Sequence, residues 1–153
     1  MSSAFGPVTD YLPHRPPMLL IDHIDEISPR HAVCRTTLRP DCVFVRDGLV
    51  HPSAMIEFVA QVCAIAATGT TARRGEPPRL GVIIGCREIS FNVDSFAVGD
   101  ELTIAVAKVL GEEELAVFNG TVSRGGVVCA TIQISCADAK LAGSQAPTSG
   151  SER

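Results

Sequence analysis

Apolar and polar positions alternate along the stretch HAVCRTTLRP at residues 31–40. One side of the alternation carries Ala32, Cys34, Thr36 and Leu38, and the other carries Val33, Arg35 and Thr37. A period of two is typical of a strand with one buried face. Just upstream, Pro13, Pro16 and Pro17 forbid a regular helix, and the apolar run Met18–Ile24 predicts another strand. We expect these two strands to pair as a hairpin.

The spacing changes from Pro52, where an Ala-rich and nearly uncharged segment extends to about Ala67, before Gly69. Proline is well tolerated in the first turn of a helix. Because the segment is apolar on most of its faces, it predicts a helix that is buried all round rather than one lying on the surface.

Four further apolar runs predict strands after the helix, and glycine-containing pairs mark the turns between them. The runs are Leu80–Phe91, Glu101–Leu110, Leu115–Ser123 and Val127–Cys136. The order favours an α+β fold in which one central helix is wrapped by a curved, meander-like antiparallel sheet. Such a sheet leaves an edge strand unpaired, so we expect pairing with a second copy as a dimer.

Composition restricts the class of protein further. The chain has 153 residues, of which 46% are hydrophobic and 20% charged, as in a globular protein with a real core. We expect one domain at residues 1–138 and a small, polar, disordered tail at 139–153. The net charge of −4 disfavours a general binder of nucleic acid.

The six cysteines show no Cys-x-x-Cys pair and no metal-ligand spacing, so we expect no metal site. The N-terminus lacks a basic region followed by an apolar core, and we interpret no apolar run as approaching the length of a membrane span. These features together favour a soluble protein in a reducing cytoplasm.

Glu57 is a carboxylate within the most apolar helix of the chain, and Gln61, four residues on, shares its helical face. An amide that hydrogen-bonds a carboxyl group can orient it, and apolar neighbours such as Phe58 favour its protonated form. This combination suits a general acid. The alternative is a carboxylate in the first helical turns, favoured by the helix dipole and partly solvated.

His51 precedes the helix, where a base could act beside backbone N–H groups that stabilise an oxyanion. The alternative is that the His51 side chain is solvent-exposed or caps the helix. His14 lies in the proline-fixed loop, as a second candidate or as a structural hydrogen-bonding group. Ser53 is more typical of a helix cap than of a nucleophile. We take His51 and His14 as candidate catalytic residues beside Glu57, and Gln61, Ser53 and Phe58 as candidate substrate contacts.

Three stretches in register resemble the hotdog-fold 3-hydroxyacyl-acyl-carrier-protein dehydratases. They are YLPHRPPMLLIDHIDEI (Tyr11–Ile27), AMIEFVAQ (Ala54–Gln61) and GVIIGCREISFNVDSFAVGDEL (Gly81–Leu102). The resemblance implies a dimer with its active sites at the interface and a substrate tethered to phosphopantetheine in an apolar tunnel. It also implies a histidine that abstracts the proton alpha to the thioester carbonyl, Glu57 as the acid that helps the 3-hydroxyl leave, and Gln61 as the residue that orients it.

The chain departs from the family just before the helix. The family's histidine lies in a Gly-His-Phe-Pro-Gly loop, which CVFVRDGLVHPSAMIE at residues 42–57 lacks. His51 is therefore a candidate replacement base. Pro52, which has no N–H, removes one expected oxyanion donor. His14 matches a recurrent family position that is not usually given the role of the base.

The Tyr-Leu-Pro-His opening, short loop and helix Glu look closest to the dehydratase-like subunits of aryl-polyene and related polyketide-type clusters. We therefore expect a 3-hydroxyacyl-thioester dehydratase acting on an acyl carrier protein or CoA substrate, with no other cofactor. An acyl-thioesterase and a non-catalytic acyl-binding subunit are the alternatives. Homodimer and heterodimer both remain open, and we expect neither nucleic acid nor a membrane as a partner.

Overall fold

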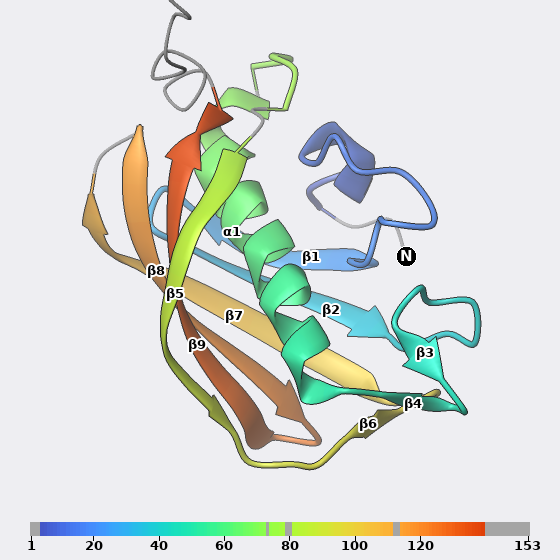
Figure 1. The fold of residues 1–153 in the computed structure, drawn as a ribbon. Helices are drawn as coiled ribbons and strands as arrows, with labels where there is room; N and C mark the ends of the chain where they lie inside the picture. Colours follow the sequence, from blue (N-terminus) through green and yellow to red (C-terminus); the bar gives the residue numbers. More distant parts are fainter. Residues whose placement is uncertain (1–3, 73, 79–80, 112–113, 140–153) are drawn as a thin grey trace, which may run out of the picture.

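One long helix lies across a curved antiparallel sheet in the computed structural model, which describes residues 4–72, 74–78, 81–111 and 114–139 (Figure 1). The helix, α1, spans Met55–Ala72 and follows a short 3-10 turn, η2, at Pro52–Ala54. Another 3-10 turn, η1, spans Val8–Asp10. The predicted fold class is confirmed. The predicted tail lies, apart from its first residue, outside the described residues.

Six strands form the main sheet in the order β1-β2-β7-β8-β9-β5, and every neighbouring pair is antiparallel. Their bounds are β1 His23–Ser28, β2 His31–Thr37, β5 Gly81–Phe91, β7 Glu101–Gly111, β8 Leu115–Arg124 and β9 Val127–Asp138. A small second sheet joins β3 Val45–Arg46, β4 Leu49–Val50 and β6 Phe96–Ala97. The β1–β2 hairpin confirms the pairing expected at the start of the chain.

The position of β5 corrects the predicted meander, in which this strand would lie beside β7. It pairs instead with β9 at the opposite edge of the sheet. The reason is competition for β7, since all of β2 from His31 to Thr37 already pairs with one side of β7. The connection after β5 is also longer than a hairpin loop and contains β6, which pairs with β4.

The strand predicted at Met18–Ile24 begins only at His23. The Asp22 N–H still bonds the Arg35 carbonyl of β2, but both backbone groups of Leu20 bond to side chains instead of to a neighbouring strand. The Leu20 N–H donates to Gln61 Oε1 at 3.0 Å, and the Leu20 carbonyl accepts from Thr36 Oγ1 at 2.6 Å. Because these bonds satisfy the backbone without a ladder, Leu20 and Ile21 are buried although they lie outside the sheet.

The helix continues five residues past its predicted end at Ala67, to Ala72, and Gly69 does not stop it. A Cβ at residue 69 would overlap the Ile27 side chain of β1. The glycine therefore allows close approach of helix and sheet instead of capping the helix.

The window Pro52–Gly69 has 18 residues and a mean hydropathy of 1.3, so by length and composition it could cross a membrane. This corrects the expectation that no apolar run approaches that length. In the structure 67% of the window is buried inside the protein. Burial against the sheet explains the hydropathy as that of a core helix.

Candidate active site

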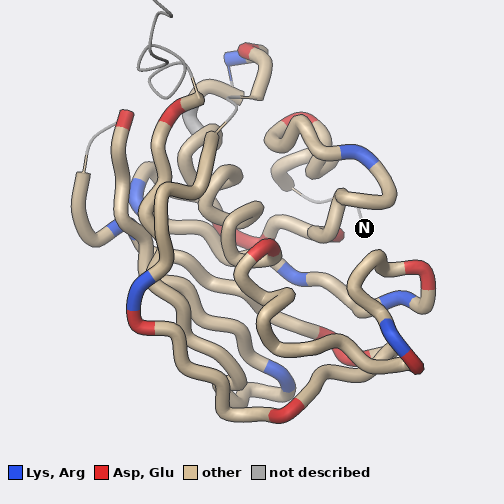
Figure 2. Tube along the Cα trace, in the orientation of Figure 1, with Lys and Arg blue, Asp and Glu red and all other residues tan. Residues whose placement is uncertain are grey.

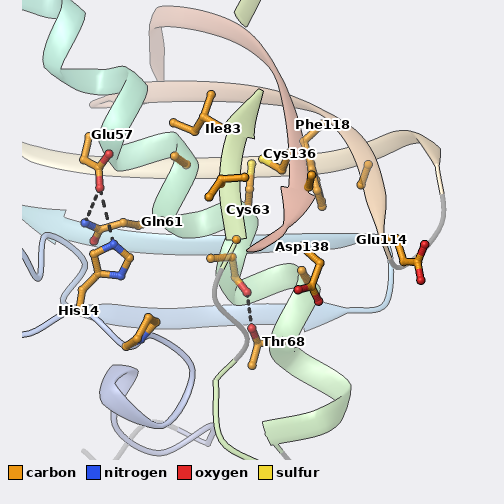
Figure 3. Close-up of a pocket in the computed structure, with 18 residues that line it drawn as sticks. His14, Glu57, Gln61, Cys63, Thr68, Ile83, Glu114, Phe118, Cys136 and Asp138 are labelled. Atoms are coloured by element: carbon orange, nitrogen blue, oxygen red, sulfur yellow. Dashed lines mark hydrogen bonds and ion pairs between the residues drawn. The ribbon is translucent and has the colours of Figure 1, made fainter. Parts of the chain in front are cut away.

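A cavity of about 350 Å³ separates one face of α1 from the strands β5, β8 and β9 (Figure 3). Small helix residues form one wall, and apolar strand residues form the other. The helix wall contains Ala60, Cys63, Ala64, Ala67 and Thr68, and the strand wall contains Val82, Ile83, Ala116, Phe118 and Cys136. The volume lies within the usual range for small-molecule sites.

The cavity runs along much of the helix. Glu57 and Thr68 both line it, and their separation of eleven residues corresponds to about 16 Å at the rise of an α-helix. The strand-end residues Glu114 and Asp138 also line the cavity, and Figure 3 draws them on the side away from Glu57. The space is thus elongated and apolar in its middle, with carboxylates toward both ends.

Three polar side chains meet at the Glu57 end. Gln61 Nε2 donates to Glu57 Oε1 at 3.2 Å, and His14 Nε2 lies 3.7 Å from the same oxygen. Figure 3 shows both contacts reaching one oxygen of the carboxyl group. The second oxygen, Oε2, takes part in neither contact. The helical spacing brings Gln61 to Glu57, whereas the fold of the proline-containing loop brings His14.

Gln61 is almost completely buried, with 1% of its surface exposed. Its Nε2 also donates to the Met18 carbonyl at 2.7 Å, and its Oε1 accepts from the Leu20 N–H at 3.0 Å. Both N–H groups of the amide and its oxygen are therefore engaged. Flipping the amide would set N–H against N–H and oxygen against carbonyl, so the contacts fix its orientation.

His14 is partly exposed, with 29% of its side chain accessible. Its Nε2 faces Glu57, while its Nδ1 is buried and has no hydrogen-bond partner within the described parts of the chain. Arg15 bonds the carbonyls of Leu12 and His14 and so shapes this loop. An imidazole and a carboxyl group held together at one end of an apolar cavity can exchange protons with a single bound molecule.

The structure places His51 and Ser53 away from this group. His51 Nδ1 contacts Ser53 Oγ at 2.8 Å and accepts from the Ser53 N–H at 3.2 Å, which caps η2. Both residues are exposed, and neither lines the cavity. The N–H groups of Ser53, Ala54 and Met55 all bond within the same turn, so in this chain they are already occupied and not turned toward an oxyanion.

Phe58 lies on another face of the helix. It is buried, packs against Phe44 with ring centroids 6.3 Å apart, and lines a second cavity of about 100 Å³. That cavity lies among the residues following the prolines and the end of β2. The structure thus brings Glu57, Gln61 and His14 together and separates Phe58, His51 and Ser53 from them.

Cys63 and Cys136 line the cavity and were not singled out by sequence reasoning. Burial, together with its contact to Cys136, raises the pKa of the Cys63 thiol. Small residues recur at helical spacing on the Glu57 face of the helix, and this pattern indicates the helix wall of the cavity. No pattern in the sequence indicates which strand residues lie opposite. No cluster of three or more potential metal ligands occurs among the described residues.

Comparison with known proteins points to one family. A family model described as ApeP-like, ApeP dehydratase, matches residues 6–146. The 3-hydroxyacyl-[acyl-carrier-protein] dehydratase FabZ of Acinetobacter baumannii is 26% identical over 132 residues, covering 83% of this chain and 90% of the relative. FabZ of Acinetobacter baylyi is likewise 26% identical, covering 83% of this chain and 88% of its own length.

Solved structures agree on the architecture. The dehydratase heterocomplex ApeI:P from Xenorhabdus doucetiae contains a chain with a TM-score of 0.81 and 29% identity, covering 86% of this chain and 90% of that one. A hypothetical thioesterase with coenzyme A from Streptococcus pneumoniae TIGR4 has a TM-score of 0.60 at 14% identity, covering 76% and 86%. The latter likeness concerns the fold alone, which is the hotdog fold.

Proposed function

Because the chain belongs to the ApeP-like family of dehydratases, whose model matches residues 6–146, we propose that it removes water from 3-hydroxyacyl thioesters. The observation that carries this proposal is the meeting of Glu57, Gln61 and His14 at one end of an elongated apolar cavity. The acyl group is attached to phosphopantetheine on an acyl carrier protein, as the name of the FabZ relatives suggests.

In this reaction His14 acts as the base and Glu57 as the acid. The imidazole takes the proton from the carbon alpha to the thioester carbonyl, and the protonated carboxyl group gives its proton to the 3-hydroxyl. The Cα–H and C3–O bonds break, a C2–C3 double bond forms, and water leaves. Proton transfer from the imidazolium to the carboxylate then restores the starting state.

Gln61 fixes the carboxyl group for this step. Since Gln61 donates to Oε1, that oxygen acts as an acceptor, and the transferable proton belongs on Oε2. The acyl chain lies along the small residues of α1, where its burial excludes water from the reacting carbons. The chemistry needs no cofactor beyond the pantetheine arm of the substrate.

The partner is a second hotdog subunit bound along β5. This strand forms one edge of the sheet, and the exposed fractions of its Ile84 and Ile83 are 59% and 41%. The other edge, β1, has the sequence HIDEIS, whose adjacent carboxylates Asp25 and Glu26 disfavour pairing. The charged residues of β5, by contrast, follow an uncharged apolar stretch at its start (Figure 2). Val82 and Ile83 also line the cavity, so pairing at β5 sets the partner beside the site. The Xenorhabdus heterocomplex makes a non-identical partner the first one to test.

The protein is expected to act in the cytoplasm. All six of its cysteines are free, which suits a reducing compartment. Fractionation of cells expressing the intact chain tests this part of the proposal, and recovery of the protein mainly with membranes or outside the cell would contradict it.

Carrier-bound 3-hydroxyacyl substrates of several chain lengths test the proposed reaction, with the chain alone and with a co-expressed hotdog partner. Enoyl thioester should form, and Glu57→Gln should reduce the rate at least 100-fold because loss of an acid in proton transfer typically costs 10²–10⁴-fold. Glu114→Gln is the matched control, since it alters a carboxylate of the same cavity that does not contact His14 or Gln61.

A second pair of variants distinguishes His14 from His51 as the base. His14→Asn should abolish turnover, whereas His51→Asn should leave at least half of it, because the structure directs only His14 to Glu57. The reverse result would make His51 the base. Release of free thiol without enoyl product would identify a thioesterase. Stable binding to the partner with no turnover in either state would identify an acyl-binding subunit.

A further inference from the structure

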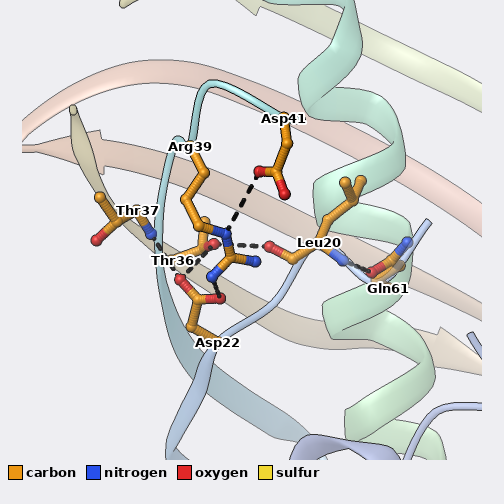
Figure 4. Close-up of polar contacts among 7 residues, drawn as sticks. All are labelled: Leu20, Asp22, Thr36, Thr37, Arg39, Asp41 and Gln61. Atoms are coloured by element: carbon orange, nitrogen blue, oxygen red, sulfur yellow. Dashed lines mark hydrogen bonds and ion pairs between the residues drawn. The ribbon is translucent and has the colours of Figure 1, made fainter. Parts of the chain in front are cut away.

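A chain of polar contacts extends from Glu57 to Asp22, and Figure 4 shows the part of it that begins at Gln61. It passes from the Glu57 carboxyl group to the Gln61 amide, and from there to the backbone of Leu20. Beyond Leu20 it reaches Thr36 on β2, whose single hydroxyl proton faces two acceptors, the nearer Leu20 carbonyl and the more distant Asp22 carboxylate. These residues belong to three separate segments of the sequence, and none beyond Gln61 lines the large cavity.

Leu20 is the link in this chain. Its N–H donates to Gln61 Oε1 at 3.0 Å, and its carbonyl accepts from Thr36 Oγ1 at 2.6 Å. Leu20 belongs to no strand, so no ladder holds its backbone in place. Its two backbone polar groups are held by the two side chains that bond them, and its N–H is one of the contacts that fix the Gln61 amide.

Thr36 is itself held firmly. It is buried, with 4% of its surface exposed, and it lies on β2, whose backbone pairs with β7 along its whole length. Its Oγ1 also lies 3.1 Å from Asp22 Oδ2. That carboxylate accepts from the Thr37 N–H at 2.9 Å and from Arg39 at 2.9 Å. The hydroxyl group thus holds the Leu20 carbonyl at a defined position relative to the sheet.

We propose that Thr36 is a positioning residue for Glu57, acting through the Leu20 backbone and the Gln61 amide. The proposal rests on the proposed dehydratase function, in which the proton of Glu57 must lie on Oε2 and point at the substrate. Without the Thr36 hydroxyl the Leu20 carbonyl loses its donor, its peptide group shifts, the Gln61 amide is held less precisely, and Glu57 samples unproductive positions. Small displacements of this kind have large kinetic effects.

Thr36→Val tests the proposal, because it removes the hydroxyl and retains the branched shape that suits a strand. We expect kcat to fall about tenfold or more, with KM changed less than about twofold, since Thr36 does not touch the substrate and acts only on the alignment of the acid. Thr36→Ser retains the hydroxyl and should keep kcat within about threefold of wild type.

A pair of carboxylate variants provides the control for surface charge. Asp22 and Asp25 each contact an arginine, but only Asp22 also contacts Thr36. Asp22→Ala should therefore lower kcat and Asp25→Ala should not. Equal kcat values for the two variants would overturn the relay beyond Thr36, and equal values for Thr36→Val and wild type would overturn the proposal itself.

The Gln61 side-chain amide offers a readout independent of turnover. Its two N–H signals in nitrogen-15 NMR should be shifted and slow to exchange in wild type and Thr36→Ser, and should move toward free-amide values in Thr36→Val. An unchanged Gln61 signal in folded Thr36→Val would contradict the proposal. If wild type forms no enoyl product while the Gln61 signal still depends on Thr36, the dehydratase function fails and the positioning contact stands. If Thr36→Val does not fold, Thr36→Ala, which also lacks the hydroxyl group, decides in the same two assays.

Discussion

Replacing Gln61 by methionine removes the amide that joins the helix to the segment after the prolines. Methionine is also unbranched, of similar length and of similar helix propensity, so the helix itself should be little affected. The change deletes three hydrogen bonds, to Leu20, Met18 and Glu57. We predict that Gln61→Met lowers the free energy of unfolding and also lowers dehydratase activity.

The magnitude follows from where each bond lies. The Leu20 N–H is buried, in a residue that is 5% exposed, so leaving it without an acceptor costs about 1–3 kcal/mol. Met18 is 38% exposed, so water can reach its carbonyl and the loss there is nearer to about 1 kcal/mol. The apolar side chain offsets part of this sum. We expect a net loss of about 2–3 kcal/mol.

Urea unfolding followed by circular dichroism measures this loss, with all variants at one protein concentration because an oligomer's stability depends on it. Gln133→Met is the matched control: Gln133 makes one solvent-facing bond, to Asn119 at 3.0 Å, and its loss should cost less than about 0.5 kcal/mol. If Gln61→Met and Gln133→Met shift the unfolding midpoint equally, the Gln61 contacts do not hold the segment and the reasoning fails.

Two further predictions concern the core. A Cβ at residue 120 would overlap Val59 Cγ1 of α1, so Gly120→Ala should destabilise the protein by about 1–3 kcal/mol. Val59→Ala removes the overlapping methyl groups, so the double variant should be more stable than the sum of the two single effects implies. Strict additivity of the two effects in urea unfolding would contradict the contact. Burial, and to a smaller extent the negative charge of Asp25, raises the pKa of the Cys34 thiol from its ordinary value of 9.0 to about 12. Its stabilising contribution is therefore fully present below pH 9 and is lost as the pH rises through 12, at about 1.4 kcal/mol per pH unit. Between pH 9 and 11 the free energy of unfolding should decline less steeply with pH in Cys34→Ala than in wild type. Identical slopes for the two proteins would refute the raised pKa of Cys34.

The segment after the prolines shows where local patterns stop being sufficient. Its apolar residues correctly predict burial, and Leu20 and Ile21 are in the core. An apolar run does not reveal that side chains take the place of a neighbouring strand in bonding the backbone of Leu20. The Leu20 N–H donates to Gln61 and the Leu20 carbonyl accepts from Thr36. Both partners are far along the sequence, and no pattern within the segment indicates them.

The sequence by itself determined the central helix, the long strands and one half of the site. A period of two specifies strands and a period of 3.6 a helix, because each depends on neighbours within a few residues. The same local geometry puts Glu57 and Gln61 on one helical face.

Only the tertiary structure decided which distant partners meet. It placed β5 beside β9 and not β7, since β2 occupies that side of β7. It also brought His14 to Glu57 across 43 positions of sequence, at 3.7 Å, while His51, six positions away, turned to cap its own turn. Nearness along the chain does not set the direction of a side chain, and contacts between distant segments arise only from the packing of the whole fold.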